Sequence, residues 1–89
     1  MAIVRFTSPF SRITGEERTR MEASTLGELC QRLIGRYGQQ MNILLDAQGD
    51  ISPGIVILVD RVNAHALSGT ATPLLDTSEV LIMPVLAGG

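Results

Sequence analysis

The stretch VLIMPVLAGG, residues 80–89, organises the rest of the chain. Val80 to Met83 is an apolar run with β-branched members, which predicts a strand, and Pro84 lacks the N–H that would extend its ladder. We therefore expect a compact domain over residues 1–85 and a flexible tail over residues 86–89. Fully extended, the four tail residues reach about 13 Å from the fold.

The tail ends in Gly88 and Gly89, which have no Cβ to hinder insertion into a narrow channel. A carboxylate at Gly89 is a poor electrophile until its oxygen becomes a leaving group, so the expected partner is an ATP-using enzyme that forms an acyl-adenylate. At roughly 7% glycine usage, two such glycines arise by chance in about 0.5% of chains. The pattern favours a substrate and carrier over a catalyst, and a glycine end without a role is the alternative.

The composition is that of one small globular domain. The chain has 89 residues, 45% of them hydrophobic and 18% charged, with a net charge of −2. It contains neither a basic cluster for nucleic acid nor an uncharged apolar run long enough to span a membrane. The N-terminus lacks a signal-peptide pattern and Cys30 stands alone, so we expect a cytoplasmic location. All seven basic residues are arginine, so no lysine side chain could accept an isopeptide-linked modifier.

The first half of the chain predicts two strands and a helix. Residues 2–7 alternate as a strand, residues 8–15 supply turn residues, and residues 16–22 suit a charged edge strand. Thr25 to Glu28 has the form of a capping box and predicts a helix start, while Gly38 suits its end. One apolar stripe follows the helical period: Leu26, Leu29, Cys30, Leu33, Ile34 and Tyr37.

The second half predicts two or three further strands. Residues 39–54 indicate a partly packed connection with a turn of helix or a short strand. Residues 55–59 form an apolar strand, residues 62–66 a short return strand, and residues 73–79 a turn into the last strand. This order predicts a two-layer α+β domain. One helix buries one sheet face, so the other is covered by residues 39–54 or left as an apolar patch for a partner.

The order of elements, the TLGE helix start, the PLLDTSEV approach and the PVLAGG end resemble the ubiquitin-like sulfur carriers of the MoaD/ThiS family. The resemblance implies the β-grasp fold, a mixed sheet of four to five strands packed on one main helix. The most specific part of the resemblance lies in residues 73–89, which are most similar to molybdopterin synthase small subunits. The chain departs from that pattern at Val85 and Leu86, at the turn over residues 76–79, and at Asp60-Arg61, where Asn-Gly is frequent.

The resemblance also implies a function. It places adenylation and thiocarboxylate formation on Gly89, and insertion into the partner's active site on the tail residues Gly88, Ala87, Leu86, Val85 and Pro84. The implied partners are an E1-like adenylating enzyme (MoeB/ThiF-like) and a sulfur-accepting synthase such as a molybdopterin synthase large subunit. The chain itself would be no enzyme and bind no cofactor, with ATP used by the activating partner. Thiamine or cysteine synthesis and ubiquitin-like protein modification are the alternatives.

Three other candidate groups fit structural roles better. His65 is the only histidine and lacks clustered ligands for a metal, so we expect a surface or strand position. Cys30 lies in the helical stripe, which predicts a buried core thiol rather than a reactive one. Asp76 and Glu79 lie in a predicted turn, where they favour backbone capping over acid/base chemistry.

Overall fold

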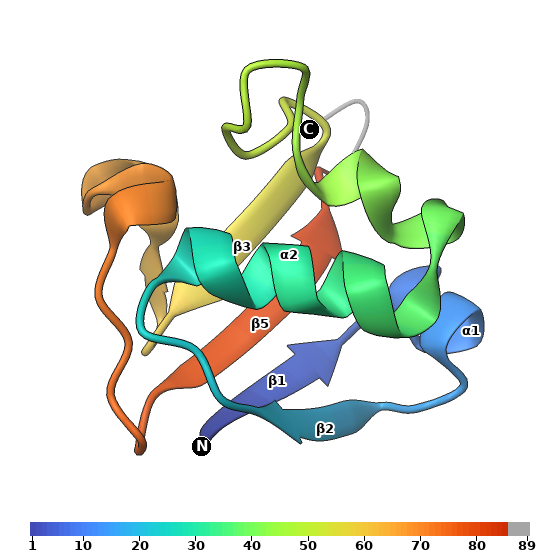
Figure 1. The fold of residues 1–89 in the computed structure, drawn as a ribbon, viewed down its shortest axis with the longest axis horizontal. Helices are drawn as coiled ribbons and strands as arrows, with labels where there is room; N and C mark the ends of the chain where they lie inside the picture. The colour runs from blue at the N-terminus through green and yellow to red at the C-terminus, as the bar shows by residue number, and fades with distance from the viewer. Residues whose placement is uncertain (86–89) are drawn as a thin grey trace.

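The computed structural model describes residues 1–85, which form a mixed β-sheet with a helix packed across one face (Figure 1). The sheet has five strands in the order β2-β1-β5-β3-β4. The central strand β5 is parallel to β1 and antiparallel to β3. The strand bounds are β1 Ala2–Phe6, β2 Arg18–Met21, β3 Ile55–Val59, β4 Val62–Asn63 and β5 Glu79–Pro84. The predicted α+β class and the main strands are confirmed.

The main helix, α2, spans Leu26–Tyr37 and begins where the sequence predicts. The Thr25 hydroxyl accepts a hydrogen bond from the Glu28 backbone N–H at 3.2 Å, which caps the first turn. The prediction that the Glu28 side chain completes the capping box is wrong. The Glu28 side chain turns along the helix and accepts a hydrogen bond from Arg32 Nε at 3.3 Å, because these residues are one turn apart.

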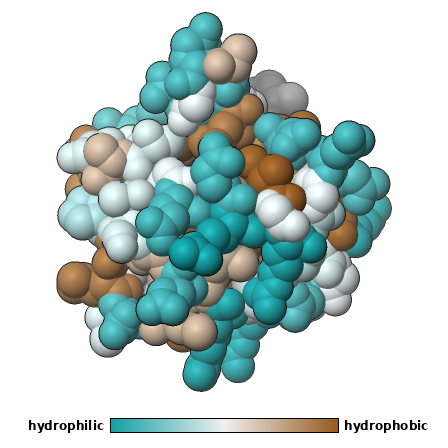
Figure 2. All heavy atoms as spheres, viewed as in Figure 1, coloured by the Kyte–Doolittle hydropathy of each residue, from teal (hydrophilic) through white to brown (hydrophobic). Residues whose placement is uncertain are grey.

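The core lies between α2 and the sheet. Strand residues with alternate spacing, such as Val4, Ile57 and Ile82, are buried against Leu29 and Leu33 of the helix. The opposite side of α2 is largely hydrophilic, and Figure 2 shows that side of the molecule with only small, separated hydrophobic patches. No helix within residues 1–85 is long and apolar enough to cross a membrane.

Residues 8–15 form more than the expected turn. They contain a short helix, α1 (Phe10–Thr14), which ends at Gly15 in a left-handed conformation. Phe10 is 1% exposed and fixes this segment to the core. The turn-forming residues around it hid this helix from sequence analysis, since its five residues are too few to show a helical period.

The connection over residues 39–54 is partly packed, as expected. It starts with a 3₁₀ helix, η1 (Gln39–Leu44), which buries Met41 and Leu44 and packs against α2. Asp46 then closes a tight loop, since its Oδ1 accepts hydrogen bonds from the backbone N–H groups of Gln48 and Asp50. This segment thus extends the helical layer and does not cover the other face of the sheet.

The predicted return strand over residues 62–66 is shorter than expected. β4 contains only Val62 and Asn63, and residues 64–66 form a 3₁₀ turn, η2. The Asn63 side chain accepts a hydrogen bond from the His65 N–H at 2.9 Å. This local capping bond competes with strand pairing and ends the strand. A third 3₁₀ turn, η3 (Gly69–Ala71), packs beside α2.

Candidate functional site

The chain leaves the described domain from the end of the central strand. Pro84 pairs with Ile55 of β3, and the Val85 N–H still donates a hydrogen bond to the Gly54 carbonyl at 3.0 Å. The expectation that pairing stops at Pro84 is therefore wrong by one residue, because Val85 supplies the N–H that proline lacks. Val85 is 49% exposed, so its side chain is available at the point from which the tail departs.

The tail residues predicted to carry the chemistry lie mostly outside the described part of the chain. Pro84 is half-buried at the end of β5 and Val85 is exposed, whereas Leu86, Ala87, Gly88 and Gly89 lie beyond residue 85. Their role in adenylation and active-site insertion stays a prediction. The domain boundary at residue 85 also stays a prediction.

The face of the sheet opposite α2 carries an apolar strip. Leu58 of β3 is paired with Leu81 of β5, and Val56 with Met83, so these four side chains form two adjacent pairs on one face. All four are half-buried. The alternate residues of the same strands face the core, which is why both strands read as apolar throughout. Of the two expected outcomes, the apolar patch is the one the described residues show.

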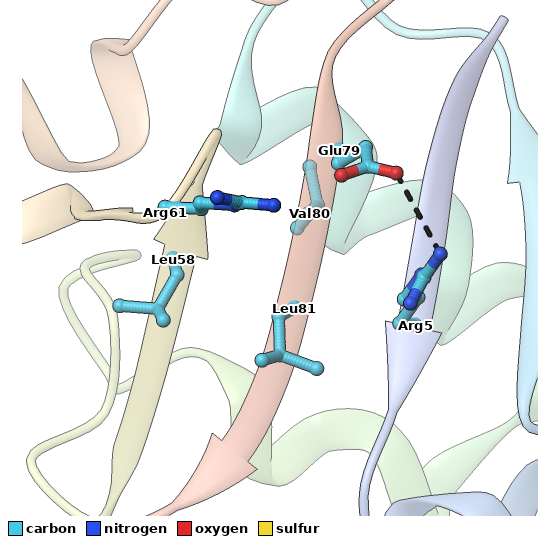
Figure 3. A pocket seen from close by; sticks show the side chains of 6 residues that line it. All are labelled: Arg5, Leu58, Arg61, Glu79, Val80 and Leu81. Atoms are coloured by element: carbon cyan, nitrogen blue, oxygen red, sulfur yellow. Dashed lines mark ion pairs between the residues drawn. The ribbon is translucent and has the colours of Figure 1, made fainter.

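Arginines surround this strip. Arg5 lies opposite Arg18 in the β1–β2 register, and Arg20 lies opposite Ile3, so all three arginines share the apolar strip's face. Arg61 reaches the strip from the turn between β3 and β4. A hollow of about 170 Å³ lies between Arg61 and Arg5 and is lined also by Leu58, Leu81 and Glu79. Figure 3 shows these side chains. Sequence analysis missed this grouping of arginines, because the four residues come from three separate segments.

The ion pairing of this surface is incomplete. Arg5 Nη2 lies 3.7 Å from Glu79 Oε1, and both side chains are about half exposed. Among residues 1–85, Arg18, Arg20 and Arg61 have no carboxylate within 4.0 Å. These exposed guanidinium groups can donate several hydrogen bonds each to an incoming carboxylate.

The turn that carries Arg61 is strained. Asp60 and Arg61 have φ angles of 49° and 73°, and their flanking residues Val59 and Val62 are paired. This is a two-residue hairpin with both central residues left-handed, the geometry for which Asn-Gly is favoured. Asp60 supports it, since its Oδ1 accepts a hydrogen bond from the Glu79 N–H at 2.9 Å. A left-handed arginine costs roughly 1–2 kcal/mol relative to the ordinary helical region.

Cys30 is a core residue, as predicted. It is fully buried under the sheet, and burial raises the pKa of its thiol from 9.0 to about 12. A thiol with so high a pKa is almost entirely protonated at neutral pH. Its burial and high pKa make Cys30 a poor nucleophile in the folded protein.

The remaining candidate residues are separate from one another. His65 is exposed on η2, outside any strand. Asp76 lies 3.5 Å from the N-terminal amine, while Glu79 faces Arg5, so the two carboxylates contact different cations. The part of the chain that the structure describes contains no group of three or more potential metal-ligating side chains.

Together, a mixed sheet folded against one main helix and a chain that leaves from the central strand define a ubiquitin-like β-grasp protein. More narrowly, the ThiS family model matches residues 4–89, and the chain belongs to the ThiS family. A curated relative from Archaeoglobus fulgidus, named "Putative sulfur carrier protein", is 29% identical over 86 residues, which cover 97% of this chain and 98% of that protein.

Solved structures share the fold across nearly the whole chain. One chain of the Amycolatopsis orientalis BexX/CysO complex is similar with a TM-score of 0.89 and 19% identity, with 100% of both chains covered. Small archaeal modifier protein 1 from Methanosarcina acetivorans is similar with a TM-score of 0.86 and 20% identity, covering 99% of this chain and 95% of that one. The β-grasp prediction is confirmed.

Proposed function

We propose that this protein is a sulfur carrier whose terminal glycine, Gly89, is adenylated and converted to a thiocarboxylate. The observation that carries the proposal is the membership of the ThiS family over residues 4–89, joined to a chain that leaves the sheet from its central strand. β5 is held on both sides, by β1 and β3, so the point of departure is fixed in space. The chain is then a carrier and substrate, with no catalytic residue of its own.

The chemistry needs no catalytic group from this chain. A Gly89 carboxylate oxygen attacks the α-phosphorus of ATP on an E1-like adenylating enzyme, and pyrophosphate leaves. A sulfide equivalent then adds to the acyl carbon, the bond to the phosphate oxygen breaks, and AMP leaves. The resulting thiocarboxylate sulfur is a stronger nucleophile than the carboxylate oxygen it replaces. ATP is bound by the partner, and this chain binds no cofactor.

We place the carrier first in molybdopterin synthesis, with a synthase large subunit as sulfur acceptor in the cytoplasm. The support is the resemblance of residues 73–89 to molybdopterin synthase small subunits. Thiamine and cysteine synthesis are the alternative pathways, and the likeness to a chain of the BexX/CysO complex keeps other acceptors open. Growth complementation of single-pathway deletion strains, each supplied with this chain, separates the three pathways.

The intact mass of the protein purified from its host, without reducing or alkylating treatment, tests the carrier function. Replacement of one oxygen by sulfur adds about 16 Da, and fragmentation must place it on Gly89 and not on an oxidised methionine. One alanine appended after Gly89 is the matched variant, since it leaves the domain intact and moves the carboxylate. Adenylation of that variant at the wild-type rate would refute a mechanism centred on Gly89.

A second function, ubiquitin-like protein modification, shares the activation step and differs in its acceptor. The structural likeness to small archaeal modifier protein 1 supports this second function as the alternative. It predicts Gly89 joined to lysine side chains of other proteins. This chain has no lysine, so lysine-linked polymers of it would not form. Unmodified Gly89 together with lysine adducts in cells would select this function over the carrier.

A further inference from the structure

Strand β5 lies between β1 and β3 (Figure 1), and its bonds to these two neighbours end at different residues. On the β1 side, the last ladder bond within the described residues runs from the Thr7 N–H to the Ile82 carbonyl at 3.1 Å. On the β3 side, the last one runs from the Val85 N–H to the Gly54 carbonyl at 3.0 Å. Between these two points the ladder bonds of the chain run to β3 alone.

Pro84 decides where the pairing with β1 ends. Bonds of a parallel pair alternate in direction along the strand, so the Thr7 carbonyl would next accept a hydrogen bond from the N–H of residue 84. Proline lacks that N–H. The Thr7 carbonyl instead accepts a hydrogen bond from the Ser11 N–H at 3.0 Å, in the first turn of α1. The chain is thus released from β1 without leaving this carbonyl unpaired.

The same proline leaves the pairing with β3 intact. The bond from the Asp60 N–H to the Glu79 carbonyl, at 2.8 Å, closes one end of the β3–β5 ladder. The bond from Val85 to Gly54 closes the other end. Bonded and non-bonded pairs alternate in an antiparallel ladder, and this alternation places Pro84 in a non-bonded pair. Its missing N–H therefore costs no bond to β3.

The Gly54 carbonyl is itself held in place. Residues 52–55 form a turn that is closed by a hydrogen bond from the Ile55 N–H to the Ser52 carbonyl at 3.0 Å. The Ser52 N–H donates to the carbonyl of Leu44, a fully buried residue of η1, also at 3.0 Å. Consecutive hydrogen bonds therefore connect the last bonded residue of the strand to the helical layer.

We propose that the Val85 N–H is a positioning group, which fixes the point from which residues 86–89 extend into the active site of the adenylating enzyme. The inference rests on the proposed carrier function. Loss of the Val85 bond also releases Pro84, which has no N–H, so the free segment grows to residues 84–89. The effective concentration of a chain end falls with about the −3/2 power of segment length, so that of the Gly89 carboxylate would fall roughly twofold.

Replacement of a single backbone N–H by an ester oxygen tests this bond without changing any side chain. The full chain is assembled from synthetic segments 1–29 and 30–89, which are joined at Cys30, and the unmodified chain is made by the same route. An ester at Val85 removes the bond at one end of the β3–β5 ladder. An ester at Asp60 is the matched control, because it removes the terminal bond at the other end of the same ladder.

ATP–pyrophosphate exchange with the purified E1-like adenylating enzyme of the same genome gives kcat and KM for each chain. The Val85 ester should lower kcat about twofold at unchanged KM, because the tail is less well positioned while the domain is intact. The Asp60 ester should leave both constants unchanged. Both esters should lower the melting temperature similarly, since each removes one ladder bond. Hydrogen exchange of the Met83 amide should become faster in the Val85 ester alone, because Met83 then forms the last bonded pair with β3.

The outcomes separate this inference from the proposed function. Equal kcat of the Val85 ester and the unmodified chain overturns the positioning role and leaves the carrier function standing. An equal fall of kcat in both esters reduces the effect to stability and also overturns it. A higher kcat in the Val85 ester overturns it as well, since the bond would then hold the tail back. Absence of adenylation of the unmodified chain, despite cooperative melting, removes the carrier function itself.

Discussion

Alkylation of Cys30 should be about a thousandfold slower in the folded protein than in the unfolded chain. Burial raises the pKa of its thiol from 9.0 to about 12, and only the thiolate reacts. At pH 8 the thiolate fraction is then about one in ten in the unfolded chain and about one in ten thousand in the fold. The side chain is also 0% exposed, which blocks the reagent itself.

Intact mass spectrometry after iodoacetamide treatment at pH 8, with and without denaturant, measures this ratio. In material purified from the host, a thiocarboxylate at Gly89 should be alkylated under native conditions while Cys30 is spared, so fragmentation distinguishes the two sulfurs. Cys30→Ala should leave the native labelling pattern unchanged. Native labelling of Cys30 within tenfold of the denatured rate would refute the argument from burial.

The same pKa shift makes stability depend on alkaline pH. The folded pKa of Cys30 lies above the unfolded value, so its contribution to stability is fully present below pH 9 and is lost as the pH rises towards 12. In this window the free energy of unfolding should fall by about 1.4 kcal/mol per pH unit. Burial also raises the pKa of Tyr37, which adds a loss of the same sign above pH 10. Urea unfolding of Cys30→Ala between pH 8 and 10 should show no such fall in the free energy of unfolding. If the variant keeps the wild-type slope, a group other than Cys30 causes the pH dependence.

The remaining predictions concern α2. Gly35→Ala should stabilise the fold by about 0.4–1 kcal/mol, because a Cβ there meets nothing within 4 Å and alanine favours helix. In Gly27→Ala the new Cβ would lie 3.1 Å from Thr70 Cβ and from its carbonyl oxygen, so thermal melting should show no gain. An equal rise for both variants would contradict this close packing. Thr25→Ala should destabilise the fold by about 1 kcal/mol in urea unfolding, because the helix cap is lost. Thr25→Ser keeps the hydroxyl and should retain the stability of the wild type. Equal stability of the two variants would exclude a capping role for Thr25.

Local chemistry in the sequence determined the main elements. Thr25 caps the helix, the stripe through Leu29 and Leu33 faces the core, and residues 55–59 form a strand, because each signal acts over one or two turns of chain. The shorter elements departed from expectation where one side chain decided the outcome. Burial of Phe10 in the core holds residues 10–14 as the helix α1. The Asn63 side chain caps η2 and thereby shortens β4.

The family likewise follows from the sequence. The proposal that Gly89 reacts also comes from the sequence alone, since residues 73–89 are contiguous and carry their own pattern. The grouping of arginines around the apolar strip follows only from the tertiary structure. Arg5, Arg18 and Arg61 are far apart along the chain, and each reads alone as an ordinary surface charge. Strand register places them around Leu58 and Leu81, because pairing between distant segments decides which side chains share a face.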